Sequence, residues 1–386
     1  MTVSDNSTPR KVLMLLSNAF DPDPRVHREA KALVDAGYEV TILGWDRDRK
    51  SASQEVVDGI TVERIYVDST HGRGSSQMFF LFMFWFKAFF AGLGKSFDVV
   101  HAHDFDTLPL GFLLAKIKGR KLVYDSHESY VDMVHWLPDW YRNTIMFVEN
   151  FMMKRADLVI TVGDILREYL ESRGANNVCV VGNWQDPEKF VFADELIAAE
   201  RDRLGVQPGQ KVIAFIANLG AERKIPELIE AVSSLKDCFL ILGGNGASAA
   251  LAQEAADTYE NIVYLGYVPS SKVPFYTAVA DIIFYGFDPD NPNARFSAPN
   301  KLFECLAAGK AMITGNFGEI GRIVREKECG VVLKGYDVAT IKNTFSELDS
   351  KNASEYGKKS ADAAVSLYCW KQAEKRLIEK YIGLPE

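Results

Sequence analysis

The sequence predicts an α/β protein with two domains of similar size, each built on a parallel β-sheet that helices cover on both faces. The chain has 386 residues, which is too many for one compact core and favours two domains. Short continuous apolar runs alternate with helical patterns, as in parallel sheets buried on both faces. The alternation loosens once, through residues 183–187, and then restarts, which places a linker there.

The first domain is expected over residues 11–185, after a polar, disordered tail at residues 1–10. Its apolar runs indicate strands at Lys11–Leu16, Tyr38–Leu43, Ile60–Ile65, Phe97–Ala102, Lys121–Asp125, Asp157–Val162 and Val178–Val181. Helical spacing separates most of these strands, at Val26–Ala36, Thr107–Lys118, Asp139–Arg155 and Asp164–Ser172.

The second domain is expected over residues 186–365. Its apolar runs indicate strands at Lys211–Ile216, Cys238–Leu242, Asn261–Leu265, Asp281–Tyr285, Ala311–Thr314 and Gly330–Leu333. A closing segment at residues 366–386 contains an amphipathic helix, Trp370–Ile382, with no strand after it.

Composition limits the classes of function. The net charge of −8 does not support a general nucleic-acid-binding surface, so no nucleic-acid partner is expected. The five cysteines are scattered without a C-x-x-C pair, which indicates reduced thiols in a cytoplasmic protein. The first ten residues are polar, so we expect no signal peptide.

An aromatic run at Met78–Phe90 predicts a helix that is apolar on all sides. It is too short to cross a bilayer, which takes about 20 residues. Its outer face would carry Phe82, Trp85 and Phe86 where a solvated helix has polar residues, so peripheral membrane contact is favoured over plain burial. The sequence therefore predicts a cytoplasmic protein that docks at the inner face of a membrane.

Several site motifs are absent or incomplete. No G-x-G-x-x-G follows a strand, so the dinucleotide fingerprint is missing. His101 and His103 are two residues apart at a strand end and should point the same way. With Asp104 they could bind a metal, but the spacing suggests no fourth ligand. We expect neither a metal nor a cofactor.

Polar loops at the carboxyl ends of strands are the candidate ligand sites, because open α/β sheets bind ligands there. These loops are residues 17–25, 101–104, 125–128, 217–224, 243–246 and 287–299. Arg223 and Lys224 precede a helix that starts near Pro226, so they could hold a diphosphate, or they could be a solvated pair. Gly244 and Gly246 would let the backbone approach a ligand closely.

The stretch Ser297–Lys310 predicts a short helix, with Pro299 at its first position. Asn300, Lys301 and Glu304 share the arc opposite its apolar face. Close to a helix N-terminus, they would suit a ligand with hydroxyls and phosphates. A solvated face with a weak Lys–Glu pair is the alternative.

Five segments together resemble family 4 of the retaining glycosyltransferases, which have the GT-B fold. They are residues 23–30, 98–103, 124–128, 156–162 and 299–310, and Trp370 ahead of the last helix also fits. The resemblance implies two Rossmann-like domains that face a cleft, with the C-terminal helix crossing back to the first domain. It implies transfer of a sugar from a nucleotide diphosphate sugar to a glycan or lipid-linked acceptor, with retained anomeric configuration and no essential metal.

The resemblance also implies roles for individual residues of the second domain. Glu304 would bind the donor ribose, Arg223 would hold the diphosphate, and Gly244–Gly246 would lie beside the nucleotide. Asn218 stands where the diphosphate loop usually has an arginine, and Lys301 would supply the missing cation.

In the first domain, the resemblance implies that His127 lies near the transferred sugar, where we assign it a positioning role. The loop around Arg25 would replace the family's glycine pair near the phosphates. His103 and Asp104, at the end of a neighbouring strand, would belong to the same acceptor and phosphate surface.

One position departs from the family pattern in a way that affects sugar binding. Phe296 stands where the first glutamate of the family's E-x7-E motif is expected. Sugar contact would then fall to the backbone around Phe317 and Gly318. Phe296 and Asn218 together leave a donor-binding but inactive partner subunit as an alternative, and a nucleotide-sugar epimerase or hydrolase of the same fold is another.

Overall fold

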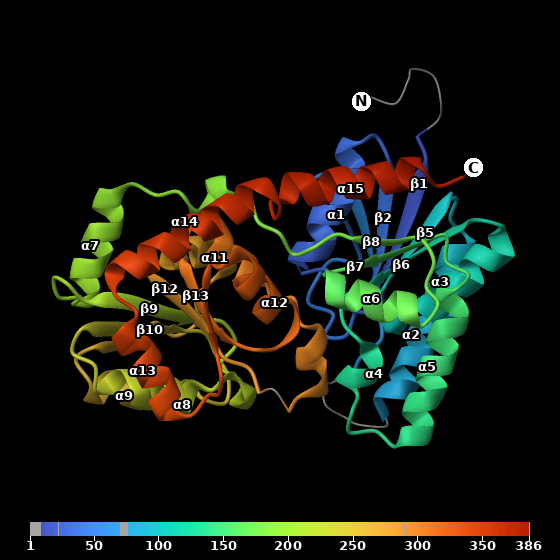
Figure 1. Cartoon of the computed structure of the whole chain (residues 1–386). Coiled ribbons are helices and arrows are strands. Elements are labelled where there is room, and N and C mark those ends of the chain that lie inside the picture. Colours follow the sequence, from blue (N-terminus) through green and yellow to red (C-terminus); the bar gives the residue numbers. More distant parts are fainter. Residues whose placement is uncertain (1–8, 22, 70–75, 289, 386) are drawn as a thin grey trace. The chain divides into compact units, whose positions relative to one another are not determined.

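The computed structural model describes residues 9–21, 23–69, 76–288 and 290–385, so most of the expected N-terminal tail lies outside the described residues. The chain divides into two compact units, Met1–Val181 with Glu374–Glu386, and Gly182–Ala373. Each unit has its own sheet (Figure 1). The strand pairs of the described residues are parallel, except for one antiparallel pair in the first sheet. The predicted α/β fold class with two parallel-sheet domains is therefore confirmed.

The first unit is built on an eight-stranded sheet in the order β3-β4-β2-β1-β5-β6-β7-β8. Its strands are β1 (Lys11–Leu16), β2 (Glu39–Asp46), β3 (Gln54–Val57), β4 (Ile60–Tyr66), β5 (Val99–His103), β6 (Lys121–Ser126), β7 (Leu158–Thr161) and β8 (Val178–Val180). Its helices are α1 (Pro24–Asp35), α2 (Ser76–Leu93), α3 (Asp104–Lys118), α4 (Tyr130–Met133), α5 (Asp139–Met153) and α6 (Asp164–Ser172).

The second unit is built on a six-stranded sheet in the order β11-β10-β9-β12-β13-β14. Its strands are β9 (Lys211–Ile216), β10 (Cys238–Gly243), β11 (Ile262–Tyr264), β12 (Ile282–Tyr285), β13 (Ala311–Gly315) and β14 (Gly330–Leu333). Its helices are α7 (Asp194–Leu204), α8 (Ile225–Ser233), α9 (Ala249–Thr258), α10 (Val273–Val279), α11 (Asn300–Ala307), α12 (Gly318–Lys327), α13 (Val338–Glu347) and α14 (Ser350–Ser366).

Both strand orders reverse direction at an inner strand, and this reversal decides where a ligand can bind. In the first sheet β1 lies between β2 and β5, and in the second sheet β9 lies between β10 and β12. Connections leave to opposite sides at such a point, which opens a crevice at the carboxyl ends of the strands. The loops after β1, β5, β9 and β12 carry part of the candidate residues predicted from the sequence, while His127 follows β6 and Gly244 and Gly246 follow β10.

Strand alternation sends neighbouring residues of β5 to different layers of the first unit. The His101 ring faces Tyr381 of the last helix, α15 (Trp370–Ile382), whose hydroxyl lies 2.8 Å from His101 Nδ1. Ala102 faces the other way, where Gly111 of α3 comes so close that a Cβ on it would lie 3.0 Å from the Ala102 methyl. Tyr381 also packs edge-to-face on Tyr38, which anchors the chain end on this unit.

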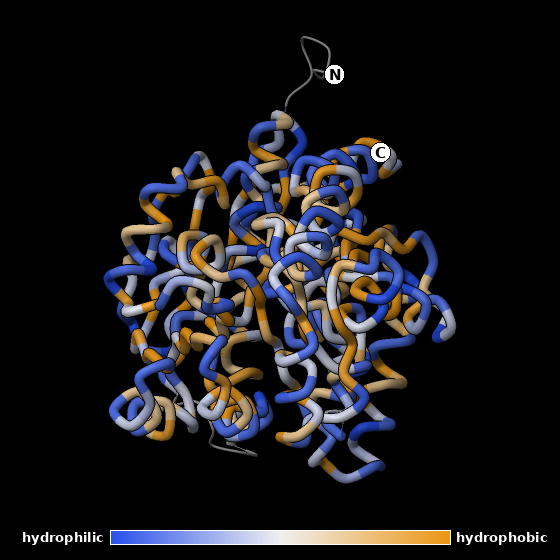
Figure 2. Tube along the Cα trace, turned by 60° about the vertical axis from the view of Figure 1, so that its left-hand side comes forward, coloured by the Kyte–Doolittle hydropathy of each residue, from blue (hydrophilic) through white to orange (hydrophobic). Residues whose placement is uncertain are grey.

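The second unit has the same three-layer plan. Helices α8 and α13 pack together on one side of its sheet, and α11 and α14 pack together on the other (Figure 1). Helical segments of the chain alternate between hydrophobic and hydrophilic residues along the trace, as expected of helices with one buried face (Figure 2).

The first sheet has an edge hairpin that the sequence did not predict. Strand β3 pairs antiparallel with β4 at the edge of the first sheet. The two residues of its turn, Asp58 and Gly59, both have positive φ, at 51° and 84°. That backbone is typical of a two-residue hairpin turn, for which Asp-Gly is a strong sequence signal. β3 was missed because two of its four residues are polar and none is buried, so it leaves no long apolar run.

The docking of α15 gives a stability prediction. Tyr381 is fully buried, so Tyr381→Ala should destabilise the first unit by about 3–5 kcal/mol through a lost aromatic ring and a cavity. Urea unfolding followed by fluorescence measures the change. Lys375→Ala, an exposed position of the same helix, is the matched control and should change stability by less than about 0.5 kcal/mol. An equally small effect of Tyr381→Ala would contradict the docking.

Candidate active site

A buried ion pair between Arg25 and Asp125 organises the carboxyl edge of the first sheet. The Arg25 guanidinium donates to both carboxylate oxygens of Asp125, with N–O distances of 3.2 and 2.9 Å. It also donates to the carbonyl of Val181 at 2.7 Å and lies 3.0 Å from Glu29, four residues along α1. Arg25 is 7% exposed. Its side chain therefore points into the unit, and the expected position of its loop near the phosphates stays a prediction.

His127 is held between two carboxylates. Its Nε2 lies 2.8 Å from Asp125 Oδ2, and its Nδ1 lies 3.1 Å from Asp104 Oδ2. The backbone N–H of His127 also donates to Asp104, at 3.1 Å. A neutral imidazole has only one N–H to donate, so two carboxylate partners favour the doubly protonated ring.

The charges around His127 shift several pKa values in matching directions. Burial alone would lower the pKa of His127, but Asp104 and Asp125 hold this pKa well above its usual range. Although burial alone would raise it, Arg25 and His127 hold the pKa of Asp125 well below its usual range. The two carboxylates therefore favour the protonated, cationic ring of His127, which agrees with a positioning role.

Asp104 adopts a backbone conformation that is uncommon for its residue type. Its φ is +60°, at the first residue of α3. This turn is what brings its carboxylate to both the ring and the backbone N–H of His127. Unusual backbone conformations persist where surrounding contacts enforce them, and they gather at functional sites.

His103 lies deeper in the unit than the sequence predicted. It is 1% exposed and stacks on His101 with 4.2 Å between ring centroids. The two rings do point the same way, as their spacing predicted. His103 Nδ1 lies 3.3 Å from Asp125, so its contact is with the buried ion pair.

Four buried side chains of the described residues could together hold a metal ion, namely Glu29, His101, His103 and Asp125. Asp104, considered from the sequence, is not among them. Arg25 already lies against both carboxylates of the group, so a metal would face a guanidinium at close range. Burial raises the pKa of Glu29 to about 8, although Arg25 opposes this. The chemistry of the set fits an internal ion network better than a metal centre.

In the second unit, two glycines fix a backbone turn after β10. Gly244 and Gly246 have φ values of +129° and +149°. A Cβ on Gly244 would lie 1.9 Å from the carbonyl oxygen of Ala217, and one on Gly246 would lie 2.5 Å from the backbone of Leu219. No side chain fits at either position. The loops after β9 and β10 therefore touch through their backbones, where the N–H of Leu219 donates to the carbonyl of Asn245 at 2.8 Å.

Arg223 lies at the same edge, beside aromatic rings. Its guanidinium is hydrogen-bonded to the Tyr285 hydroxyl and lies 4.5 Å from the centre of the Phe287 ring. Glu222 Oε1 is 3.2 Å from its Nε. Lys224, the next residue, has φ +58° and lies 3.8 Å from Asp288. The diphosphate candidates are thus positioned by the β12 loop, and Asn218 is exposed on the β9 loop.

Helix α11 begins at Asn300, one residue after the expected Pro299, and its polar side chains are less accessible than predicted. Lys301 is 7% exposed and forms an ion pair with Glu304. The predicted Lys–Glu pair therefore exists, but within a largely buried setting and not on a solvated face. Lys301 is not an uncompensated cation, and a ligand that uses Glu304 would have to share it with Lys301. Asn300 is exposed at the helix start.

Phe296, at the position of the missing motif glutamate, is buried in the unit at 4% exposure. Its loop packs closely on the start of α12, because the backbone N–H of Glu319 donates to the carbonyl of Ser297 at 3.0 Å. A Cβ on Gly318 would lie 2.6 Å from the carbonyl oxygen of Ala294. Phe317 packs on Phe287, with ring centroids 5.8 Å apart. The Phe317–Gly318 backbone thus adjoins the loop that carries Arg223's aromatic partner.

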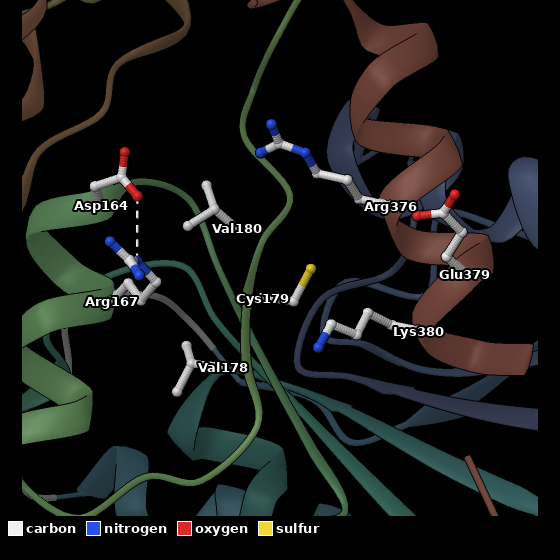
Figure 3. Close-up of a pocket in the computed structure, with 8 residues that line it drawn as sticks. All are labelled: Asp164, Arg167, Val178, Cys179, Val180, Arg376, Glu379 and Lys380. Atoms are coloured by element: carbon white, nitrogen blue, oxygen red, sulfur yellow. Dashed lines mark hydrogen bonds and ion pairs between the residues drawn. The ribbon is translucent and has the colours of Figure 1, made fainter. Parts of the chain in front are cut away.

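A cavity of about 490 Å³ in the first unit contains none of the predicted site residues. It lies beside the edge strand β8, with α6 on one side and α15 on the other (Figure 3). Arg167 pairs there with Asp164 at 3.1 Å, and Lys380 donates to Asn177 at 2.8 Å. Its cations are already engaged within the chain.

Some site residues had no assigned role in the sequence prediction. Asp125 and Glu29 are the partners of Arg25, and Tyr285 and Phe287 are the partners of Arg223. The i,i+4 spacing of Arg25 and Glu29 on one helix was a usable signal. The contact of Arg25 with Asp125 spans 100 residues and has no local signature.

Two family models match the chain. The Glycosyl transferase 4-like domain matches residues 22–184, and the Glycosyl transferases group 1 domain matches residues 197–362. The protein is a family 4 glycosyltransferase. The predicted family and enzyme class are therefore confirmed, and the two models fall on the two structural units.

Curated relatives are distant. The alpha-monoglucosyldiacylglycerol synthase of Acholeplasma laidlawii is 25% identical over 205 residues, which are 48% of this chain and 52% of that protein. The chain thus aligns with about half of that relative's length. An uncharacterised glycosyltransferase of Methanocaldococcus jannaschii is 24% identical over 316 residues, which are 78% of each chain.

Solved structures share the fold over the whole chain. Sucrose-phosphate synthase from Thermosynechococcus elongatus superposes with a TM-score of 0.77 at 17% identity, covering 97% of this chain and 99% of that one. Anabaena HepE in complex with UDP-glucose superposes with a TM-score of 0.70 at 16% identity, covering 97% and 100%. These likenesses confirm the GT-B fold of the glycosyltransferase.

The His127 contacts give a pH prediction. The pKa of His127 is raised above its ordinary value of 6.5, so the stabilisation by its ion pairs is complete below pH 6.5 and is lost as pH rises through the raised value. His127→Gln should therefore destabilise the protein by about 3 kcal/mol near pH 6.5, and by less in alkaline solution.

Urea unfolding of both proteins between pH 6.5 and 10 measures this difference. His27→Gln is the matched control, because His27 pairs with Asp58 at the surface and its loss should change stability by less than about 1 kcal/mol. A difference for His127→Gln that stays constant over this pH range would show that His127 carries no charge.

Proposed function

We propose that this glycosyltransferase moves a sugar from a nucleotide diphosphate sugar to a glycan or lipid-linked acceptor, with retention of anomeric configuration and without a metal ion. One observation carries the proposal: the turn at Gly244 and Gly246 and the Arg223 guanidinium lie at the same edge of the second sheet. A turn without side chains suits a nucleotide, and a guanidinium suits a diphosphate. HepE, a structural neighbour, was solved with UDP-glucose, which supports this donor class.

Glycosyl transfer requires mainly the stabilisation of the charges that develop in the transition state. Breaking the bond to the sugar leaves negative charge on the diphosphate and positive charge on the sugar. Arg223 would stabilise the leaving diphosphate, and stabilisation of this kind is usually the largest catalytic contribution. If the acceptor attacks from the face of the leaving group, the departing phosphate takes the acceptor proton. No side chain then needs to act as general base, which agrees with a charged His127.

A lipid-linked acceptor is favoured by an apolar surface on the first unit. On α2, Phe79 is 63% exposed, Phe82 is 53% exposed and Phe86 is 67% exposed. Trp85, predicted with them, turns inward and donates its ring N–H to the carbonyl of Asp106. Tyr141 of α5 reaches Met78 of α2, and the exposed Trp140 and Phe147 on α5 extend the surface.

Exposed aromatic residues on two neighbouring helices suit the interfacial region of a bilayer. No helix among the described residues has the length and apolar character needed to cross a membrane. The relative from A. laidlawii is named for a diacylglycerol product, which also favours a lipid acceptor. On the exposed aromatic residues and this relative, we propose a cytoplasmic protein in peripheral contact with the inner face of a membrane.

A donor-binding but inactive partner subunit is the second candidate. Phe296 is buried where the family places its sugar-binding glutamate, and Lys301 is already paired with Glu304. Both observations weaken the expected sugar contacts. Turnover decides between the two candidates, because both predict nucleotide binding.

The donor site gives a binding prediction. Arg223→Ala should weaken binding of a nucleoside diphosphate by about tenfold or more, the effect of losing a charged hydrogen-bond donor. Calorimetric titration against uridine, guanosine and adenosine diphosphates measures the effect and identifies the base. Arg203→Ala is the matched control, because Arg203 is an exposed arginine of the same unit that pairs with Glu200.

Turnover of the matching nucleotide sugar with lipid and glycan acceptors, in the presence of a chelator, then tests the reaction. The product should have the donor's anomeric configuration by NMR. Diphosphate binding without turnover on any acceptor would favour the inactive subunit, and no binding of any diphosphate would remove the donor-site assignment.

The membrane surface gives a flotation prediction. The protein should float with vesicles of mixed phosphatidylglycerol and phosphatidylcholine, and the double variant Phe82→Ser/Phe86→Ser should float about tenfold less, because two exposed aromatic side chains are lost. Tyr267→Ser, which removes a 69% exposed aromatic residue of the second unit, is the matched control and should float like the unaltered protein. Equal flotation of all three would remove the assignment of this surface.

A further inference from the structure

A second cavity lies at the opposite edge of the second sheet from the donor loops. Its volume is about 570 Å³. Lys211 begins β9, while Asp281 and Lys310 immediately precede β12 and β13, and all three line the cavity. Because these strands are parallel, their amino ends meet at one edge and the loops with Arg223 and Gly244 meet at the other. The cavity is therefore separate from the proposed donor site.

The lining of this cavity carries an excess of positive charge. Four basic side chains face one carboxylate there, namely Arg201, Lys211, Lys310 and Lys358 against Asp281. Two of the cations are satisfied within the chain. Arg201 pairs with Asp281 at 2.8 Å, and Lys211 donates to two backbone carbonyls and pairs with Asp237 at 3.0 Å.

The other two cations, Lys310 and Lys358, differ from these. Within residues 9–21, 23–69, 76–288 and 290–385, the Nζ of neither lysine forms a hydrogen bond or an ion pair, although the charges of Asp281 and Asp194 do act on Lys310. The hydroxyl-bearing residues Ser350 and Ser354 of α14 line the same space. The cavity thus combines two unpaired amines with groups that can donate further hydrogen bonds.

The backbone of Lys310 is fixed beside the cavity. The carbonyl of Lys310 accepts a hydrogen bond from Ser360 at 2.7 Å, and its N–H donates to the carbonyl of Cys305 at 3.1 Å. Gly309 packs against Gly357 of α14, where a Cβ on Gly357 would lie 2.4 Å from the Gly309 carbonyl oxygen. Burial lowers the pKa of Lys310, since the charged amine lacks full solvation. Asp281 opposes this effect of burial, and a bound anion would add to the attraction that Asp281 provides.

We propose that this cavity binds a phosphate group between Lys310 and Lys358, carried either by inorganic phosphate or by a phosphorylated sugar. Phosphate is the favoured anion because it accepts several charge-assisted hydrogen bonds at once from amines and hydroxyls. The proposal goes beyond glycosyl transfer, since no residue of the donor loops lines the cavity. It gives the second unit a separate site for a phosphorylated metabolite.

Thermal unfolding of the whole protein tests the proposal, since a ligand that binds only the folded state raises the melting temperature. Inorganic phosphate should raise it more than chloride at equal ionic strength and pH. Lys310→Met keeps the side-chain stem and removes the amine, and should lower the apparent phosphate affinity by about tenfold or more. Without phosphate, this variant should be at least as stable as the unaltered protein, because an unpaired, partly buried charge is gone.

Two further variants separate this site from general charge effects and from folding effects. Lys358→Ala, at an exposed position, should also weaken the phosphate response, so the test does not depend on Lys310 alone. Lys272→Met is the matched control, because Lys272 is an exposed lysine of the same unit that does not line the cavity, and it should keep the full response.

The source of the phosphate is distinguished by comparing glucose 6-phosphate with inorganic phosphate. Tighter binding of the ester supports a sugar phosphate, and equal binding supports the inorganic ion. The proposal is overturned if phosphate gives no more stabilisation than chloride, or if Lys310→Met responds like the unaltered protein. It is also overturned if Arg223→Ala abolishes the response, because the phosphate would then be bound at the donor loops.

Discussion

The ion pair of Arg25 with Asp125 is the interaction on which the first unit's polar edge depends. It joins the start of α1 to the end of β6, and through Val181 to the segment after β8. Removing one partner from such a buried pair leaves an unpaired charge, which commonly costs about 3–5 kcal/mol. Asp125 also accepts from His127, so the same carboxylate that neutralises Arg25 sets the charge and orientation of the candidate sugar-positioning histidine.

The candidate site of the second unit depends instead on the close approach of two backbone segments, the loops after β9 and β10. Its donor loops need Gly244 and Gly246 because the neighbouring chain occupies the space of a side chain. Arg223 is oriented by Tyr285, the last residue of β12, and by Phe287, two residues further along the chain. One unit therefore holds its site by buried charge, and the other by shape and aromatic packing.

The sequence was sufficient for the fold class and for most strands, because apolar runs and loop positions are local properties. It was also sufficient to place His127, Arg223 and the two glycines at strand ends. It could not show that Arg25 turns inward or that Lys301 is taken by Glu304, because both outcomes depend on burial and on partners that local patterns do not define. The hairpin at Asp58 and Gly59 did carry a local signal, but β3 is short and largely exposed, so it gives no strand pattern of its own.

The position of α15 has a consequence for how the protein forms during synthesis. Residues 374–386 belong to the first unit, and Tyr381 fills its core beside His101 and Tyr38. Domains usually fold in the order in which they leave the ribosome. Here the unit that begins first lacks part of its core until residues 374–385 emerge, so the second unit can be complete before the first. A chain cut before Tyr381 would have an intact second unit and an unfinished first one.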